Sequence, residues 1–179
     1  MEVNLHPNQW DIFQSEARYK VVAAGRRFGK SYLAATLLFI EGSRKTKVRS
    51  DGVEVDLIAD PVYYVCPTFK QAKENLWKVC MDMGGDLIAH TRQNEGEIEL
   101  TNGRIIRFKG MDEPDNLRGA GLSYCVLDEY AFMPEWPWEY IIKPMLMYSE
   151  GGVLFIGTPA GKNHFYRLHQ KGESGEDPR

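Results

Sequence analysis

The stretch VVAAGRRFGKSYLAA, residues 21–35, passes from small and β-branched residues through a turn rich in Gly and Arg into an alanine-rich run. This change predicts a buried strand, a tight turn and a helix. The turn fits the phosphate-loop pattern GxxxxGK[ST], except that Ala24 stands where the first Gly belongs. Such a loop binds phosphate through backbone N–H groups and the positive end of the following helix, so this position tolerates Ala. We expect Gly25 to supply the unusual backbone dihedral.

Side chains of this loop have predicted tasks. Lys30 is expected to lie across the β- and γ-phosphates of ATP, and the Ser31 hydroxyl to coordinate Mg²⁺. Gly29 lets the backbone approach the phosphates closely. Arg26 and Arg27 are candidates for stabilising charge on the transferred phosphoryl group within their own subunit. The residues assigned to the nucleotide are Ala24, Gly25, Arg26, Arg27, Phe28, Gly29, Lys30 and Ser31.

A second apolar run, SYCVLDEY at 123–130, ends in two acids. Because successive strand residues point to opposite sides, Asp128 is expected to face the Mg²⁺ shell while Glu129 activates the attacking water. This division of tasks predicts a hydrolase. The alternative is that both acids cap a helix that starts near Ala131.

Two shorter segments fit the same site. Gly157, Thr158 and Pro159 follow an apolar strand, and the Thr158 hydroxyl is placed to sense the γ-phosphate. The alternative is an ordinary turn, which Gly-Thr-Pro often forms. Gln9, in the segment HPNQ, is a candidate for hydrogen bonds to an adenine edge, or else a solvent-exposed helix residue.

Arg118 lies in DEPDNLRGAG at 112–121, a loop bounded by Gly. Such a loop is suited to carry an arginine into the nucleotide site of a neighbouring subunit, which would require a ring or another oligomer. The alternative is a surface ion pair with a nearby acid of the same loop, which contributes little to stability.

Alternating strand and helix patterns predict an α/β domain with a mostly parallel sheet and helices on both faces. The Asn102-Gly103 pair between alternating runs predicts a β-hairpin over 97–108. The predicted helices are 8–18, 30–41, 69–83 and a broken helix over 133–148. The other predicted strands are 19–24, 62–66, 123–130 and 152–161.

Composition excludes several classes of protein. The chain has 179 residues, 43% of them hydrophobic, with a net charge of −3. It shows no apolar stretch long enough to span a membrane and no secretion signal at its first residues, so we expect a cytoplasmic protein without a membrane partner. Three scattered cysteines predict reduced thiols. A local basic run, Arg44, Lys45, Lys47 and Arg49, is a candidate DNA contact or simply a solvated loop.

Taken together, the segments HPNQ, AGRRFGKS, YYVCPTF, LRGAG, VLDE and IGTPAG resemble the ATPase domain of the terminase large subunits of tailed bacteriophages. Their order and spacing match over nearly all of the chain. The resemblance implies a P-loop NTPase of the additional-strand, catalytic-glutamate type. It also implies a motor that hydrolyses ATP to push double-stranded DNA into a procapsid. The implied partners are the portal protein, the small terminase subunit and further copies of the chain in a ring, at the portal vertex in the host cytoplasm.

By position, the resemblance assigns phosphates and Mg²⁺ to Lys30 and Ser31, and Mg²⁺ to Asp128. It assigns water activation to Glu129, and coupling to the segment 157–159. Adenine is assigned to Gln9, and the trans-acting arginine to Arg118.

The resemblance also sets expected domain limits. Residues 1–171 are expected to form the ATPase domain, and 172–179 a flexible tail before a lid and a nuclease domain that this chain lacks. A helicase-like or remodelling ATPase is an alternative, but it would require a second lobe. A non-hydrolysing nucleotide-binding scaffold is another, and Glu129 argues against it.

Overall fold

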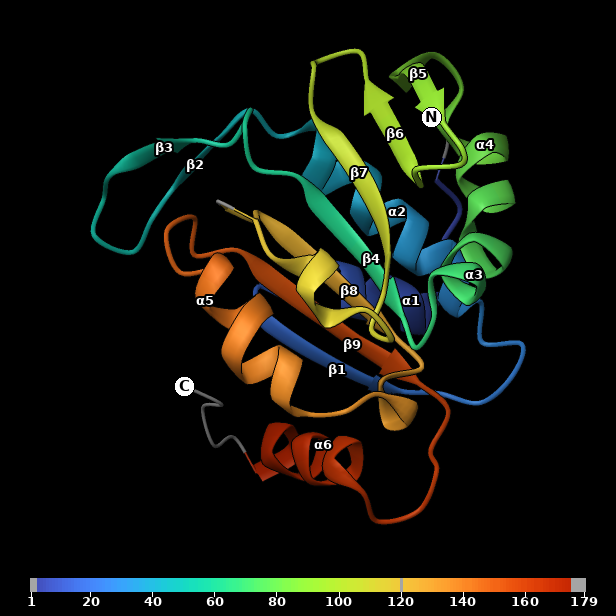
Figure 1. Ribbon diagram of the computed structural model, residues 1–179. Coiled ribbons are helices and arrows are strands. Elements are labelled where there is room, and N and C mark those ends of the chain that lie inside the picture. Colours follow the sequence, from blue (N-terminus) through green and yellow to red (C-terminus); the bar gives the residue numbers. More distant parts are fainter. Residues whose placement is uncertain (1–2, 120, 175–179) are drawn as a thin grey trace.

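The structure is a computed structural model that describes residues 3–119 and 121–174. Its centre is a seven-stranded sheet with the order β1-β9-β8-β4-β7-β6-β5 (Figure 1). The first five strands in this order run parallel, and β6 and β5 add antiparallel pairs at one edge. The strands are β1 (Tyr19–Ala23), β4 (Val62–Cys66), β5 (Ile88–Arg92), β6 (Glu97–Leu100), β7 (Ile105–Gly110), β8 (Tyr124–Asp128) and β9 (Gly152–Gly157). The predicted α/β class is confirmed.

Helices cover both faces of the sheet (Figure 1). One face carries α1 (Pro7–Gln14), α2 (Lys30–Ser43), α3 (Phe69–Ala72), the π-helix η1 (Lys73–Trp77) and α4 (Lys78–Gly84). The other carries the 3-10 helix η3 (Pro114–Leu117), the π-helix η5 (Trp138–Ile142), α5 (Lys143–Met145) and α6 (His164–Ser174). Two short 3-10 turns also occur: η2 (Gly85–Leu87) between α4 and β5, and η4 (Tyr130–Phe132) after β8.

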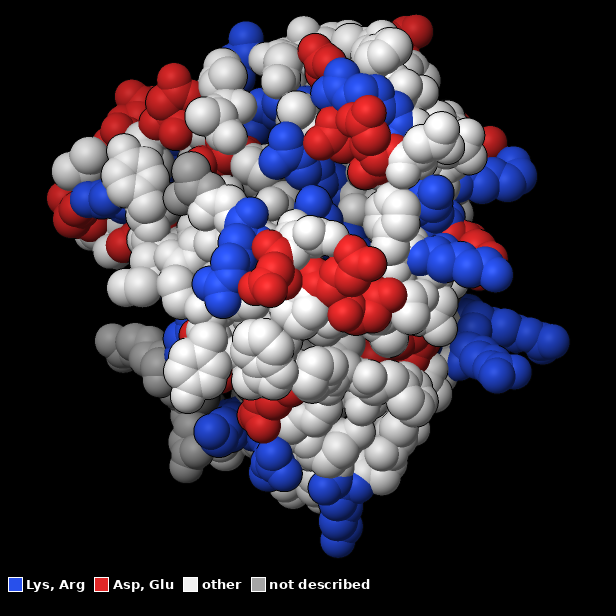
Figure 2. Space-filling view, viewed as in Figure 1, with Lys and Arg blue, Asp and Glu red and all other residues white. Residues whose placement is uncertain are grey.

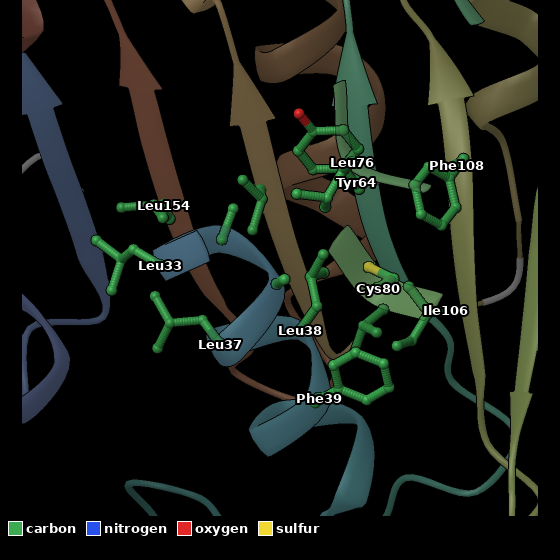
Figure 3. Packing of buried hydrophobic residues seen from close by; sticks show 14 of the residues in the cluster. Leu33, Leu37, Leu38, Phe39, Tyr64, Leu76, Cys80, Ile106, Phe108 and Leu154 are labelled. Carbon is green, nitrogen blue, oxygen red and sulfur yellow. The ribbon is translucent and has the colours of Figure 1, made fainter. Parts of the chain in front are cut away.

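The core lies in two layers, one on each face of the central strands. Every residue of β4 and β8 is buried, as expected for parallel strands covered on both sides. On the α2 face, Leu33 and Leu38 pack with Tyr64 and Phe108 in one apolar cluster (Figure 3). The sheet is therefore a rigid support for the loops that follow its strands.

Several predicted boundaries need correction. The first helix ends at Gln14 rather than at residue 18, because Ser15 adopts an extended conformation that ends it. The strand β5 was not predicted, since its burial pattern is irregular. The predicted hairpin forms as β6 and β7, and β7 also pairs with β4. Of the predicted flexible tail, residues 172–174 continue α6, and 175–179 lie outside the described residues.

The predicted basic loop includes a strand, β2 (Thr46–Val48), which pairs with β3 (Glu54–Asp56) beyond the loop in a second, two-stranded sheet. Figure 1 shows this hairpin beside the amino ends of the parallel strands, whereas the loop before α2 lies at their carboxyl ends. The three cysteines are buried and free, as predicted. Within the described residues, no helix is both long and apolar enough to cross a bilayer.

Candidate functional site

The candidate site forms where three neighbouring strands end. Ala23 of β1 is paired with Gly157 of β9, and Asp128 of β8 is paired with Ile156. Because these strands are parallel, their carboxyl ends lie together. The site therefore combines the loop after β1, the segment after β9 and the acids that end β8. Open α/β sheets bind ligands beyond these carboxyl ends.

Lys30 connects two of these strand ends. Its Nζ donates a hydrogen bond to the Ala24 carbonyl oxygen at 2.9 Å and another to Thr158 Oγ1 at 2.9 Å. The backbone N–H of Ala24 donates to the Gly157 carbonyl oxygen at 3.0 Å. Lys30 thus links the loop after β1 to Thr158 in the segment after β9.

The backbone of the loop differs from the prediction in one respect. The left-handed conformations fall on Arg27 (φ 67°) and Gly29 (φ 81°), and Gly25 does not adopt one. Ala24 is buried in the core with an ordinary backbone, so a Cβ fits where the general pattern has Gly. A Cβ on Gly29 would lie 2.5 Å from Gln9 Nε2, so this position requires Gly for two reasons.

Gln9 holds the loop rather than facing solvent. Its side chain is only 3% exposed, and its Nε2 donates to the carbonyl oxygens of Phe28 (3.2 Å) and Gly29 (3.0 Å). Its Oε1 accepts from the N–H of His6 at 3.1 Å. The His6 ring contributes a contact to the Phe28 carbonyl oxygen at 3.0 Å. The alternative of a solvent-exposed Gln9 is wrong, because the capping box that starts α1 turns its amide onto the loop.

Asp128 is the buried acid of the site, with 4% exposure. Its Oδ2 accepts a hydrogen bond from the Tyr64 hydroxyl, and its Oδ1 accepts from the Glu129 N–H at 2.9 Å. Burial raises the pKa of the Asp128 carboxyl, while the Tyr64 hydrogen bond and the positive charge of Lys30 oppose this rise. Asp128 is thus a buried carboxyl with both oxygens hydrogen-bonded.

Glu129 leaves the strand by a route that alternation did not predict. It adopts a left-handed conformation, with φ 57° and ψ 39°, and it directly precedes the 3-10 helix η4. A bulky residue rarely adopts this conformation, and residues in sparsely populated backbone regions tend to cluster at active sites and switch regions. Gly157 lies beside it, since a Cβ there would approach the Glu129 Cα at 3.4 Å. Glu129 therefore lies just outside the strand, and its side chain is half-buried, whereas Asp128 is buried.

The three predicted arginines lie in different surroundings. Arg26 and Arg27 are exposed on the loop, and neither makes a salt bridge with another described residue. Arg118 follows η3, and its side chain, 61% exposed, pairs with Asp115 at 3.1 Å. The ion-pair alternative for Arg118 is therefore present in this conformation. Its exposure leaves it accessible to another subunit.

The basic segment 44–49 lies away from this site, beside the amino ends of the parallel strands (Figure 1). Lys47 Nζ donates to the Glu150 carbonyl oxygen, and burial lowers the pKa of Lys47. Arg49 pairs with Asp51 and lies over the Tyr148 ring, 5.8 Å from its centroid. Arg44 pairs with Glu41 at 3.5 Å. Lys45 is exposed, and it is in none of the salt bridges among the described residues.

Figure 2 shows that the surfaces at the carboxyl and amino ends of the parallel strands differ in charge. Lys and Arg side chains project from the edge that carries the loop before α2 and the helices α3 and α4. Acidic and basic side chains are mixed on the hairpin β2–β3.

The donor set fits a magnesium ion that is shared with a nucleotide. Ser31 offers a half-buried hydroxyl and Asp128 a carboxylate, both hard oxygen donors. No group of three or more His, Cys, Asp or Glu side chains within 3–119 and 121–174 could hold a metal by itself. Magnesium sites of nucleotide enzymes use one or two protein oxygens and complete the shell with phosphates and water, so a hydroxyl and a carboxylate are a sufficient contribution from the protein.

Sequence reasoning missed two residues of the site, His6 and Tyr64. His6 caps α1 through its ring, but the sequence pattern of a capping box has Ser or Thr at this position, so the segment HPNQ did not reveal the contact. Tyr64 gave no signal, because a Tyr in the middle of the run VYYVC is ordinary for a buried strand.

Comparison with known proteins places the chain in a family. Residues 21–171 match the family described as terminase large subunit, T4likevirus-type, N-terminal. The terminase large subunits of Thermus virus P23-45 and Thermus phage G20c are each 29% identical over 181 residues. That match includes 95% of this chain and 37% of each relative, so the chain spans little more than a third of their length.

Solved structures give the same result. The large terminase ATPase domain of Thermus phage P74-26 superposes with a TM-score of 0.71 at 26% identity, over 92% of this chain and 69% of that one. The large terminase of a thermophilic bacteriophage in complex with ATP-gamma-S has a TM-score of 0.70 at 13% identity, over 97% of this chain and 43% of that one. The fold is thus that of a P-loop NTPase, and the chain belongs to the terminase large subunit family, as part of its N-terminal region.

Proposed function

We propose that this chain hydrolyses ATP, with Mg²⁺, to drive double-stranded DNA into a viral procapsid. The observation that carries the proposal is the pair of hydrogen bonds from Lys30 to Ala24 and Thr158, at the edge where Asp128 and Glu129 also emerge. The large terminase of the thermophilic bacteriophage, which has the same fold and is in complex with ATP-gamma-S, supports nucleotide binding.

In the proposed complex, Lys30 exchanges its Ala24 and Thr158 partners for phosphate oxygens. Backbone N–H groups of the loop and the first turn of α2 bind the same phosphates. The Ser31 hydroxyl and the Asp128 carboxylate hold Mg²⁺. When bound, this ion neutralises charge on the β- and γ-phosphates.

Glu129 is the proposed general base. Its carboxylate accepts the proton of a water that attacks the γ-phosphate. Glu129 is half-buried and Asp128 is buried, and the proposal assigns proton transfer to the first and metal binding to the second. Arg26 and Arg27 stabilise the transferring phosphoryl group in their own subunit, and Arg118 does so from a neighbouring subunit.

Gln9 and Thr158 have supporting tasks in the proposal. Gln9 holds the loop through Nε2, and its Oε1, which accepts one bond from His6, keeps a lone pair for an adenine amino group. Thr158 loses its Lys30 partner when the γ-phosphate is present. The segment Gly157, Thr158 and Pro159 thereby reports nucleotide state to the rest of the motor.

The proposed setting follows from the family. Residues 1–171 form the ATPase domain of a longer subunit, which works as a homo-oligomeric ring with the portal protein and the small terminase subunit. The ring acts at the portal vertex in the host cytoplasm. We assign no nuclease step to the residues of this chain.

The test is an ATPase assay of the full-length protein with DNA present, comparing wild type and Glu129→Gln. The variant should bind ATP with wild-type affinity and turn it over at least ~100-fold more slowly, because the general base is lost. Glu135→Gln is the matched control, since Glu135 is an exposed acid whose partner is Arg167 at 3.4 Å.

The alternatives give other results. ATP binding without hydrolysis by the wild-type protein, with DNA present, would favour a nucleotide-binding scaffold. Separation of DNA strands would favour a helicase-like ATPase.

A further inference from the structure

We infer that Tyr64 is a positioning residue whose hydroxyl fixes the Asp128 carboxylate in the orientation that binds magnesium. The inference rests on the proposed function, because it assigns Asp128 to the metal. Tyr64 lies in the segment YYVCPTF, to whose tyrosines the sequence pattern assigned no task.

Strand register explains why a tyrosine reaches this acid. Tyr64 of β4 is paired with Val126 of β8, and Asp128 follows Val126 by two residues on the same face. Diagonal neighbours on adjacent strands lie ~7–8 Å apart, a separation that a tyrosine side chain bridges. The hydrogen bond from the Tyr64 hydroxyl to Asp128 Oδ2 is the result.

The tyrosine ring has little freedom to move. Tyr64 is fully buried, and its ring lies edge-on to Phe108 with centroids 5.6 Å apart. Trp77 packs on the other side of this aromatic group, 5.2 Å from the Phe108 centroid. Figure 3 shows Tyr64 and Phe108 side by side on neighbouring strands, with Leu76 against the tyrosine. The hydroxyl is therefore a fixed donor.

Two donors from different directions orient the carboxylate. Oδ2 accepts from Tyr64, and Oδ1 accepts from the Glu129 N–H at 2.9 Å. Each oxygen retains lone-pair capacity for a metal or its water. The χ2 torsion of Asp is broad, so removing the Tyr64 bond lets the carboxylate rotate. Groups that orient metal ligands in this way typically affect metal affinity ~10–100-fold.

Tyr124 provides a matched control. It is also buried, lies on β8 with Asp128, and belongs to the same apolar cluster as Tyr64. Its hydroxyl, however, has no hydrogen-bond partner within the described part of the chain. Tyr124→Phe therefore removes the same atom from the same core without removing a hydrogen bond.

The experiment measures Mn²⁺ binding to the full-length protein by electron paramagnetic resonance, with ATPγS present. Tyr64→Phe should weaken Mn²⁺ binding ~10-fold. Tyr124→Phe should leave it unchanged, and nucleotide affinity in EDTA should be the same for all three proteins. Thermal unfolding of each variant checks that it is folded.

A double-mutant cycle of Tyr64→Phe and Asp128→Asn, measured as Mn²⁺ affinity, separates positioning of the carboxylate from a general structural effect. If Tyr64 acts through Asp128, Tyr64→Phe should cause no further loss in that background. Equal Mn²⁺ affinity for wild type and Tyr64→Phe, or an equal loss with and without Asp128, overturns the inference while the proposed function stands. Failure of the wild-type protein to bind Mn²⁺ with ATPγS overturns the proposed function and the inference together.

Discussion

Two segments of this chain each carry several cations and at least one glycine, but their cations have different partners. The loop 24–31 lies at the carboxyl ends of the parallel strands, and the hairpin segment 44–56 lies beside their amino ends. In the loop, the Lys30 amine donates to one carbonyl and one hydroxyl oxygen. In the hairpin, Arg49 pairs with an acid, and Lys47 donates to a carbonyl oxygen of the segment before β9.

Position relative to the sheet distinguishes the two segments better than their charge does, because both carry several cations. The neutral partners of Lys30 can be exchanged for phosphate at modest cost, whereas the Arg49–Asp51 ion pair adds charge attraction to the hydrogen bond. The loop is therefore ready to bind an anion. The hairpin uses Arg49 and Ser50 to hold itself against the acid and aromatic residues of 148–150.

The largest expected difference comes from replacing one lysine in each segment. Lys30→Met should lower ATP turnover at least ~100-fold, because a fixed positive charge on the transferring phosphoryl group is lost. Lys47→Met should leave turnover within about twofold, because its amine is bound to Glu150 at the far edge. Steady-state ATPase rates decide, and equal losses in the two variants would remove the distinction.

A second comparison uses two glycines with nearly the same backbone. Gly29 has φ 81° and Gly52 has φ 82°, so Ala at either position costs about 1 kcal/mol of left-handed strain. Only at Gly29 does the new Cβ meet a side chain, Gln9 Nε2 at 2.5 Å. Gly29→Ala should therefore lose about 1–3 kcal/mol more than Gly52→Ala in the free energy of unfolding. Urea titrations measure both, and similar losses would mean that Gln9 does not constrain the loop.

A third test concerns the link between the loop and β9. Thr158→Val keeps the shape of the side chain and removes the oxygen that accepts from Lys30. Turnover should fall ~10-fold, because Thr158 is proposed to sense the γ-phosphate through this hydroxyl, and one hydrogen bond to a charged group contributes about 1.5 kcal/mol. Unfolding free energy should change little, since Lys30 keeps Ala24 as a partner. Unchanged turnover would show that the strand end after β9 does not take part.

The smallest effect is expected for the hairpin and DNA. Of its four cations, we propose Arg44 and Lys45 as the phosphate contacts, because Arg44 is 52% exposed and Lys45 is also exposed. The double variant Arg44→Ala/Lys45→Ala should reduce the salt slope of DNA binding by ~1–2 and leave sequence preference unchanged. An unaltered slope would exclude the hairpin from the DNA path.

Much of the site was predictable because its chemistry is local. Lys30 and Ser31 follow a strand, and Asp128 ends another, so the short motifs that contain them also fix the edge where they meet. The backbone route of Glu129 and the two left-handed positions of the loop were not predictable. They depend on how neighbouring segments pack around Gly157 and Gln9.

Contacts between distant segments were beyond the sequence pattern. Gln9 donates a hydrogen bond to the Gly29 carbonyl oxygen, and Tyr64 on β4 donates one to Asp128 on the neighbouring strand β8. Neither contact is indicated by the residues of its own segment. The basic run 44–49 was interpreted as a loop, and its short strand β2 was not predicted, because the strand that pairs with it, β3, lies beyond the run.

The most direct test is a crystal structure of the protein with Mg²⁺ and ATPγS. The account predicts that Lys30 Nζ leaves Thr158 for phosphate oxygens, that the Ser31 hydroxyl contacts the metal with Asp128 beside it, and that Glu129 faces the γ-phosphate. A nucleotide bound elsewhere on the molecule, with Lys30 still bound to Ala24 and Thr158, would contradict it.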